Sequence, residues 1–250
     1  QVSHGFRGFR PRSAKDTKIG GDTSASCNID VICDGTTLPG GVGALIDGMR
    51  DQIRSVGAYT LGGVDACSGT LLNNVNGDLV PYFLTAAHCD VTVANAASMV
   101  VYWNFENSTC RTPGSAASGQ VGDGDLSQFN TGAIFRAADA ATDFCLVELD
   151  DDPDPTYNLH FAGWDNSIAV PTMSTGIHHP AVAEKRISFD LDSPTITDAD
   201  SADVNSNAGY LRIIDWDHGA TEGGSSGSGL FNENGRIVGQ LFGGDAECGN

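Results

Sequence analysis

The sequence predicts an all-β protein built from two antiparallel β-barrels of six strands each. Glycine is abundant, with 32 residues among 250, while charged residues make up only 18% of the chain. This composition is typical of short strands joined by many turns. Short apolar runs also recur along both halves of the chain, separated by clusters of glycine, asparagine and aspartate. The length suits one large domain or two small ones, and all-β barrels of this size often form a single unit.

Six of these runs lie in the first half, and six short strands between turns make one antiparallel barrel. The runs are Val56–Leu61, Cys67–Leu72, Val80–Thr85, Met99–Trp103, Gly132–Phe135 and Phe144–Leu149. Residues 73–78 (NNVNGD) carry an Asn-Gly pair, which is a hairpin signal. Before the strands, Ala44–Arg54 has apolar residues at helical spacing and predicts a short helix. We therefore expect the first barrel at about residues 52–150.

The second half repeats the pattern and predicts a second barrel at about residues 158–250. Its runs are Phe161–Trp164, Ser174–His178, Arg186–Asp190, Tyr210–Trp216, Gly229–Phe231 and Ile237–Leu241. Residues 1–23 have no periodic apolar pattern, so we interpret them as an N-terminal arm or the remnant of a pro-segment. The main domain is then residues 24–250, and a maturation cleavage is expected between Lys18 and Ser24.

The charge balance limits the partners of the protein. Acidic residues outnumber basic ones by 32 to 13, which gives a formal net charge of −19. This charge disfavours binding to nucleic acid and to anionic membranes. It is typical of an acidic surface that keeps a protein soluble, although it would also attract basic substrates. The chain has no apolar run of about 18 residues, so we expect no membrane insertion. It starts at Gln1 without a visible signal peptide, and we expect a leader to have been removed.

Neither a metal nor a cofactor is expected. The 7 cysteines lack the paired spacing of a zinc site and instead indicate an oxidising compartment. The acidic run Asp150–Asp154 lacks the spacing and the glycine of a calcium-binding EF-hand loop. We interpret it as a solvated turn, and likewise Asp198, Asp200 and Asp203.

Three stretches together indicate nucleophilic catalysis. Residues 221–231 (TEGGSSGSGLF) predict a glycine-rich turn that exposes Ser226 before an apolar strand, although such a run alone is more typical of a flexible loop. Residues 84–89 (LTAAHC) supply His88, and residues 142–149 (TDFCLVEL) place Asp143 at the start of an apolar run. The chain order histidine, aspartate, serine is that of trypsin-like peptidases.

Each residue type suits one role in such a site. A serine hydroxyl needs an imidazole to take its proton, and a buried carboxylate fixes the orientation of that imidazole. The backbone N–H groups of Gly224 and Ser226 can converge on a developing oxyanion. His178 and His179 form a rival pair of imidazoles, but no acidic residue stands in a suitable strand context, so we interpret both as structural.

Several longer stretches resemble the bacterial lysyl endopeptidases, which have the trypsin-like fold. These stretches are residues 26–33 (SCNIDVIC), 82–89 (YFLTAAHC), 100–110 (VVYWNFENSTC), 177–188 (IHHPAVAEKRIS), 221–228 (TEGGSSGS) and 238–244 (VGQLFGG). The resemblance runs from about Ser24 to the C-terminus and has an extra segment near residues 35–50. It implies three disulfides, namely Cys27–Cys248, Cys33–Cys110 and Cys67–Cys89, which leave Cys145 as a small buried hydrophobe.

The resemblance implies a specificity pocket that this sequence holds only in part. In the family, three features follow the cysteine that corresponds to Cys248: the acidic residue that selects lysine, a further strand and a terminal helix. None of these is in this sequence. Ala220 stands where trypsin has its pocket aspartate, and Phe242 stands where the family has a histidine. The candidate pocket residues are Glu222, Phe242, Gly243, Gly244 and Asp245.

The sequence therefore favours a secreted serine endopeptidase. His88, Asp143 and Ser226 would hydrolyse protein or peptide substrates through an acyl-enzyme, after lysine or another basic residue. The alternative hypothesis is a catalytically inactive, protease-like interaction domain of a larger secreted protein. We expect a monomer or a part of a longer chain.

Overall fold

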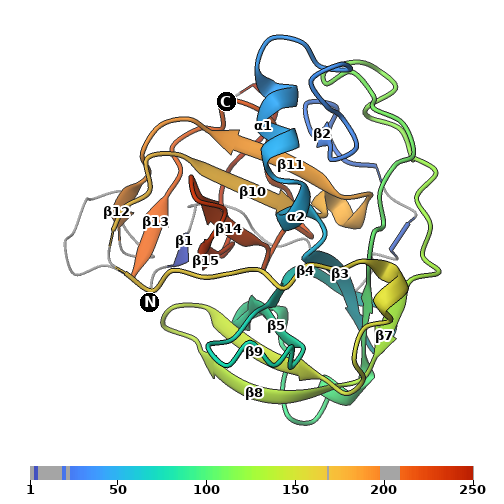
Figure 1. The fold of residues 1–250 in the computed structure, drawn as a ribbon, viewed down its shortest axis with the longest axis vertical. Coiled ribbons are helices and arrows are strands. Elements are labelled where there is room, and N and C mark those ends of the chain that lie inside the picture. Colours follow the sequence, from blue (N-terminus) through green and yellow to red (C-terminus); the bar gives the residue numbers. More distant parts are fainter. Residues whose placement is uncertain (1–2, 5–18, 21–22, 168, 198–208, 250) are drawn as a thin grey trace.

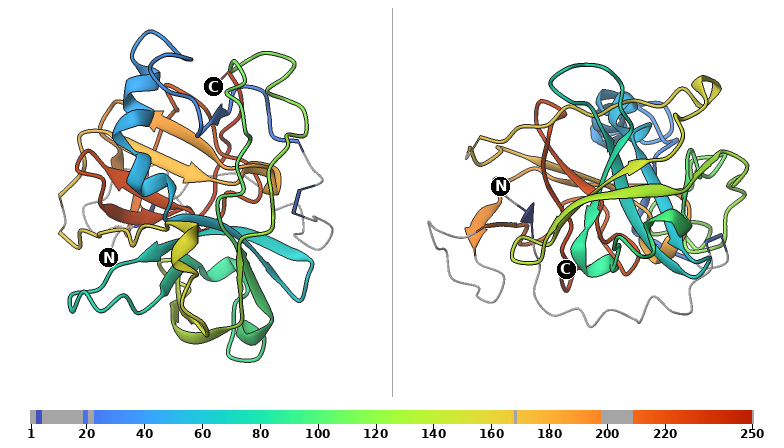
Figure 2. Two further views of the ribbon diagram at one scale, coloured as in Figure 1. Left: turned by 45° about the vertical axis from the view of Figure 1, so that its right-hand side comes forward. Right: turned by 90° about the horizontal axis from the view of Figure 1, so that it is seen from below.

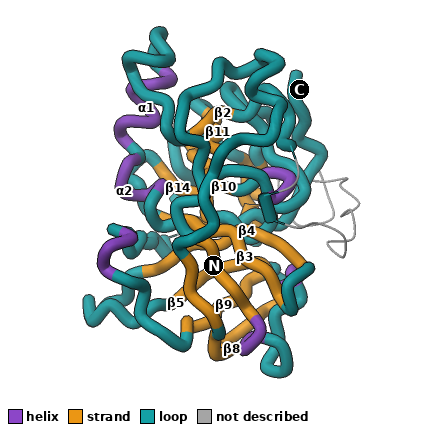
Figure 3. The backbone as a smooth tube through the Cα atoms, turned by 90° about the vertical axis from the view of Figure 1, so that its right-hand side faces the viewer, coloured by secondary structure: helices purple, strands orange, loops and turns teal. Residues whose placement is uncertain are grey.

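Two β-rich halves stacked on each other make up the structure (Figure 1). The computed structural model describes residues 3–4, 19–20, 23–167, 169–197 and 209–249. Figure 3 shows the strands of one half below those of the other, with short helices at the periphery. This mostly-β arrangement confirms the predicted all-β fold class. Most of residues 1–23, together with Asp198, Asp200 and Asp203, lies outside the described residues.

A single antiparallel sheet forms the first half, with seven strands in the order β7-β6-β3-β4-β5-β9-β8. Its strands are β3 (Val56–Leu61), β4 (Asp65–Leu72), β5 (Tyr82–Ala86), β6 (Met99–Tyr102), β7 (Phe129–Thr131), β8 (Ala133–Asp139) and β9 (Phe144–Leu149). The sheet curls (Figure 2), so the side chains on its inner face share one core. The ring of Phe83 packs edge-on with Tyr59 and with Trp103 at the centre of this core, at centroid distances of 5.8 and 5.7 Å.

The described strands of the second half form two sheets. A five-stranded sheet has the order β15-β14-β10-β11-β2, and a three-stranded sheet has the order β1-β13-β12. The strands are β1 (Ser3–His4), β2 (Ile29–Asp30), β10 (Ser174–His178), β11 (Arg186–Asp190), β12 (Thr195–Thr197), β13 (Tyr210–Arg212), β14 (Gly229–Asn232) and β15 (Ile237–Gln240). Trp216 packs with Leu211 and Leu230 in a core on one side of β14.

Two short helices cover the other face of the five-stranded sheet. Helix α1 spans Val42–Gly48 and α2 spans Arg50–Ile53, so the single predicted helix is interrupted at Met49. Ile46 and Ile53 are buried against a core that contains Phe189. Among the described residues, the remaining helical segments are single 3-10 turns, namely η2 (Ala87–Cys89), η3 (Ala96–Ser98), η4 (Pro155–Tyr157) and η5 (Pro180–Val182).

The strand count differs from the predicted six per barrel. The first sheet contains one strand more than expected, namely β7. Its sequence has no apolar alternation that would indicate a strand, since Phe129 and Thr131 are exposed and only Asn130 is buried. In the second half, Phe161–Trp164 forms isolated bridges only, at Ala162 and Trp164. The predicted strand Tyr210–Trp216 is shorter in the structure and ends at Arg212.

Three disulfides connect distant parts of the chain. They join Cys27 to Cys248, Cys33 to Cys110 and Cys67 to Cys89, which are the pairs that the family resemblance implies. Cys145 is a free, fully buried thiol, and burial raises its pKa to about 11. Within the described part of the chain, no helix is both long and apolar enough to cross a bilayer.

Candidate active site

Strand pairing in the first sheet brings His88 and Asp143 together. β5 pairs with β9, and the last residue pair of this ladder is Ala86 with Phe144. His88 follows β5 in η2, and Asp143 immediately precedes β9, so both residues lie at the same end of neighbouring strands. The backbone N–H of Ala87 donates to the carbonyl of Asp143 at 2.8 Å, which holds the two segments in register.

Asp143 contacts His88 twice. One carboxylate oxygen accepts from the backbone N–H of His88 at 2.8 Å, and the other lies 2.7 Å from the ring Nδ1. Asp143 is buried, whereas 30% of the His88 side chain is exposed. With Nδ1 donating to the carboxylate, Nε2 is the ring nitrogen that is free to accept a proton. The backbone of Asp143 is left-handed, with φ of 55°, a conformation that aspartate tolerates better than most residues.

Ser226 lies in the turn before β14, and both halves of the molecule hold this turn. Its carbonyl accepts from the N–H of Ser68 in β4 at 2.9 Å. The Ser68 hydroxyl donates to the carbonyl of Gly224 at 2.8 Å. From the second half, the carbonyl of Leu241 accepts from the N–H of Gly227 at 2.9 Å. The turn is therefore fixed by backbone bonds on both sides.

Gly227 allows this turn to approach β5. A Cβ atom there would lie 2.2 Å from the Thr85 hydroxyl oxygen and 2.8 Å from the N of Ala86, so no larger residue fits. Its φ of 81° also favours glycine. The contact places the turn of Ser226 against the end of the strand that leads to His88. Among the described residues, the His88 ring has no hydrogen bond to the Ser226 hydroxyl; such bonds often tighten only when substrate binds.

The backbone N–H groups of Gly224 and Ser226 are available to a ligand. Neither donates a hydrogen bond to any described residue, although the N–H of Ser225 between them donates to Glu222 at 3.0 Å. Gly224 has φ of 92°, and a Cβ there would lie 2.7 Å from the N of Val182. A glycine at this position therefore permits the turn that leaves both N–H groups unpaired.

The second half also contacts His88 and the residue that precedes Asp143. The Gln240 side chain donates to the carbonyl of Thr142, the residue before Asp143, at 3.0 Å. The ring of Phe242 packs edge-on against His88, with 5.9 Å between ring centroids. These contacts hold the Asp143 turn and the His88 ring against β15 and the segment after it.

Comparison with known proteins assigns the chain to a family. The family model described as "Lysyl endopeptidase, C-terminal domain" matches residues 21–250. The chain belongs to the lysyl endopeptidase family. It is 30% identical over 232 residues to the lysyl endopeptidase of Pseudomonas aeruginosa, and the match covers 90% of this chain and 47% of that protein. The chain thus spans about half the length of the curated relative that it matches.

Solved structures resemble the chain at low sequence identity. The crystal structure of Deg5 has a TM-score of 0.53 and 13% identity, and the match covers 84% of this chain and 90% of that one. The HtrA-type protease AlgW with tripeptide has a TM-score of 0.49 and 15% identity, with 78% and 52% of the two chains covered. The Deg5 match supports the trypsin-like protease fold expected of a lysyl endopeptidase.

The candidate pocket residues divide into two groups. Phe242, Gly243, Gly244 and Asp245 follow β15 directly, and Asp245 is exposed. Glu222 instead has its carboxylate bonded to the N-terminal segment, where it accepts from the Ala25 N–H at 2.8 Å and from the Asn28 side chain. Burial raises the pKa of Glu222. In this structure its contacts connect the segment before Ser226 to the start of the domain.

His178 and His179 lie inside the second half, as expected of structural residues. Both are fully buried, and burial lowers the pKa of His178 to about 3 and that of His179 well below its usual value. Nδ1 of His178 lies 2.7 Å from the hydroxyl oxygen of Ser225, the neighbour of Ser226. Ser68 and Gln240 also hold the site, and sequence reasoning missed both, because neither carries a local motif.

Proposed function

We propose that this chain is the catalytic domain of a serine endopeptidase that cleaves after lysine through His88, Asp143 and Ser226. The observation that carries the proposal is the pair of contacts between Asp143 and His88, next to a turn whose two N–H groups are unpaired. A buried carboxylate, a partly exposed imidazole and a turn that carries a serine are the parts that acyl transfer requires.

In the first stage, the Ser226 hydroxyl attacks the scissile carbonyl and passes its proton to Nε2 of His88. Asp143 stabilises the resulting imidazolium. The carbonyl oxygen becomes an oxyanion, which accepts hydrogen bonds from the N–H groups of Gly224 and Ser226. His88 then donates its proton to the leaving amine, the peptide C–N bond breaks, and an acyl-enzyme ester remains on Ser226.

In the second stage, water attacks the acyl-enzyme. His88 takes a proton from the water, and the oxyanion forms again beside the same two N–H groups. When this intermediate collapses, the ester C–O bond breaks and the proton returns to Ser226. The products are a carboxylic acid and the free enzyme, and no cofactor takes part in these steps.

Two observations support a preference for lysine. The family match and the Pseudomonas aeruginosa relative both carry the description lysyl endopeptidase. The net charge of −19 also favours the approach of a cationic side chain. Of the two acidic pocket candidates, Glu222 bonds to Ala25 and Asn28, and Asp245 is exposed in the segment after β15.

The proposal is tested with peptides that differ only at the residue before the scissile bond. We expect kcat/KM for lysine to exceed that for norleucine, its uncharged counterpart, by at least about 10²-fold. The neutral side chain would leave the acidic group of the pocket without an ionic partner. Arginine should give an intermediate value. Equal rates for all three would contradict the specificity, and no cleavage of any of them would favour the inactive interaction domain.

We also propose that the protein works outside the cytoplasm. Its three disulfides need an oxidising environment to form and persist. Recovery of the protein from the culture medium rather than from cells would test this directly.

A further inference from the structure

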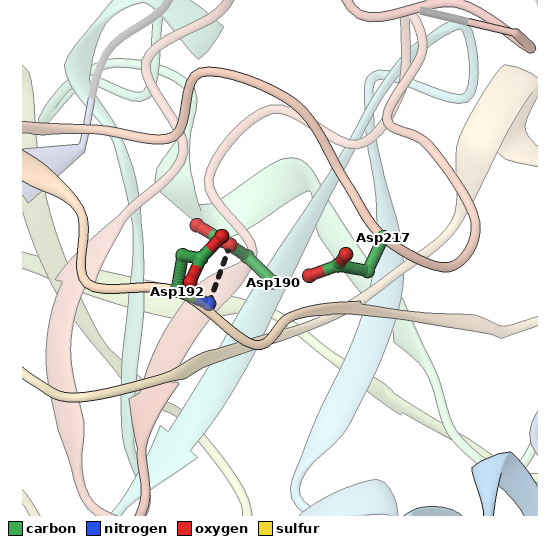
Figure 4. A group of neighbouring side chains, drawn as sticks. All are labelled: Asp190, Asp192 and Asp217. Carbon is green, nitrogen blue, oxygen red and sulfur yellow. Dashed lines mark hydrogen bonds between the residues drawn. The ribbon is translucent and has the colours of Figure 1, made fainter.

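Three aspartates of the second half gather at one point, and none of them belongs to the candidate active site (Figure 4). Asp190 ends β11, Asp192 lies two residues later, and Asp217 belongs to the connection between β13 and β14. One carboxylate oxygen from each lies within 4.8 Å of the others. A backbone bridge between Phe189 and His218, with hydrogen bonds of 2.9 and 3.1 Å, brings the two segments together.

Within the described part of the chain, no basic side chain forms an ion pair with these carboxylates. Their hydrogen bonds come from backbone N–H groups, from Asp192 to Asp190 at 3.0 Å and from Leu191 to Asp217 at 2.7 Å. Asp190 is buried, and its burial, followed by the charges of Asp217, Asp192 and Asp215, raises its pKa to about 6. Three carboxylates therefore lie close together, and no described basic side chain pairs with them.

An independent observation beside the aspartates also indicates a ligand. Ser174 lies directly opposite Asp190 in the pairing of β10 with β11, so both side chains point to the same face of the sheet. Ser174 is fully buried, and its hydroxyl oxygen has no hydrogen-bond partner among the described residues. Its other cross-strand neighbour, Asn232, already accepts from two backbone N–H groups. A buried polar atom without a partner is unusual and favours an unseen ligand.

We propose that Ser174, Asp190, Asp192 and Asp217 form a binding site for Ca²⁺. All four residues offer oxygen, which is the ligand that this hard cation prefers. No histidine or cysteine belongs to the group, which disfavours zinc. Asp192 and Asp217 are exposed, so water can supply the further ligands that calcium takes.

The bound cation would connect the end of β11 to the segment that leads to Ser226. Asp217 precedes Thr221 by four residues, and Ala220 between them is fixed to β11 because its carbonyl accepts from the Ser188 hydroxyl at 2.8 Å. Calcium would therefore stabilise the second half of the fold and take no part in bond cleavage.

The first test is the melting temperature of the protein in calcium, in magnesium and in EDTA at pH 8. At a calcium concentration of about 100 times Kd, we expect Tm to rise by about 5–10 °C over that in EDTA, with a smaller shift in magnesium. The neighbouring Trp216 should also sensitise the luminescence of bound Tb³⁺, and calcium should displace that signal.

Variants locate the site. Asp192→Asn alters an exposed side chain and should remove most of the calcium shift, whereas Asp152→Asn, in the exposed acidic turn of the first half, should leave the shift unchanged. Asp190→Asn removes another of the proposed ligands and should also reduce the calcium shift.

Two results would overturn the proposal. One is a Tm that agrees within about 1 °C in calcium and in EDTA. The other is a calcium shift that survives in both Asp190→Asn and Asp192→Asn, because the cation would then bind elsewhere. Neither result depends on peptidase activity, so the calcium site and the proposed function can fail separately.

Discussion

A Ser226→Ala variant should lose peptidase activity by about 10⁵- to 10⁶-fold, the largest effect that we expect from any single substitution. The variant lacks the atom that forms the acyl-enzyme, and only the oxyanion donors and substrate binding remain. Because the Ser226 hydroxyl has no hydrogen bond to any described residue, Tm should change by less than about 1 °C. The measurement is kcat/KM on a lysine peptide, with Tm measured on the same preparation.

Ser225→Ala is the matched control, since Ser225 is the adjacent serine and also lies near a histidine. Its hydroxyl oxygen is 2.7 Å from Nδ1 of His178 and accepts from the N–H of Glu222 at 3.1 Å, but both Ser225 and His178 are fully buried. The variant should lose about 1–3 kcal/mol of stability and far less activity than Ser226→Ala. If Ser225→Ala were the inactive variant and Ser226→Ala remained active, our assignment of the nucleophile would be wrong.

Asp143→Asn should lower kcat by about 10⁴-fold with little effect on KM. The asparagine oxygen can still accept from the backbone N–H of His88, but its NH₂ group then faces Nδ1. Nδ1 must become the acceptor, so the proton moves to Nε2, and His88 can no longer take the proton of Ser226. Steady-state kinetics on the lysine peptide measures this loss.

Asp139→Asn provides the comparison for this variant. Asp139 lies four residues earlier, is exposed, and accepts from Ala141 and Thr142 within the same turn. Its replacement should leave kcat within about twofold of the wild-type value. A similar loss in both variants would mean that the geometry of the turn, rather than the Asp143 carboxylate, supports activity.

Local patterns in the sequence predict much of the fold. Strands β3 and β9 begin and end where their apolar runs do, since both pack into one core. The Asn-Gly signal also corresponds to a turn, in which Gly77 has φ of 63° and Asn74 accepts from its backbone N–H. These features depend on residues close together in the chain, which is why periodicity and turn chemistry can predict them.

Features set by distant pairing could not be predicted in this way. No local pattern shows that Glu222 bonds to Ala25, or that Asp217 lies beside Asp190. The motifs did single out His88, Asp143 and Ser226, but the contacts of Ser68 and Gln240 that hold the site depend on how the two halves pack. Such contacts follow from the register of strands far apart in sequence.

Labelling with a fluorophosphonate probe tests the central claim most directly, because the probe reacts only with an activated serine. Peptide mass spectrometry of the adduct identifies the labelled residue without any assumption about substrate. We predict a single adduct on Ser226 in the folded protein with its disulfides intact, and no adduct in a His88→Ala variant. An unlabelled folded protein, or an adduct on another serine, would contradict the proposed serine endopeptidase.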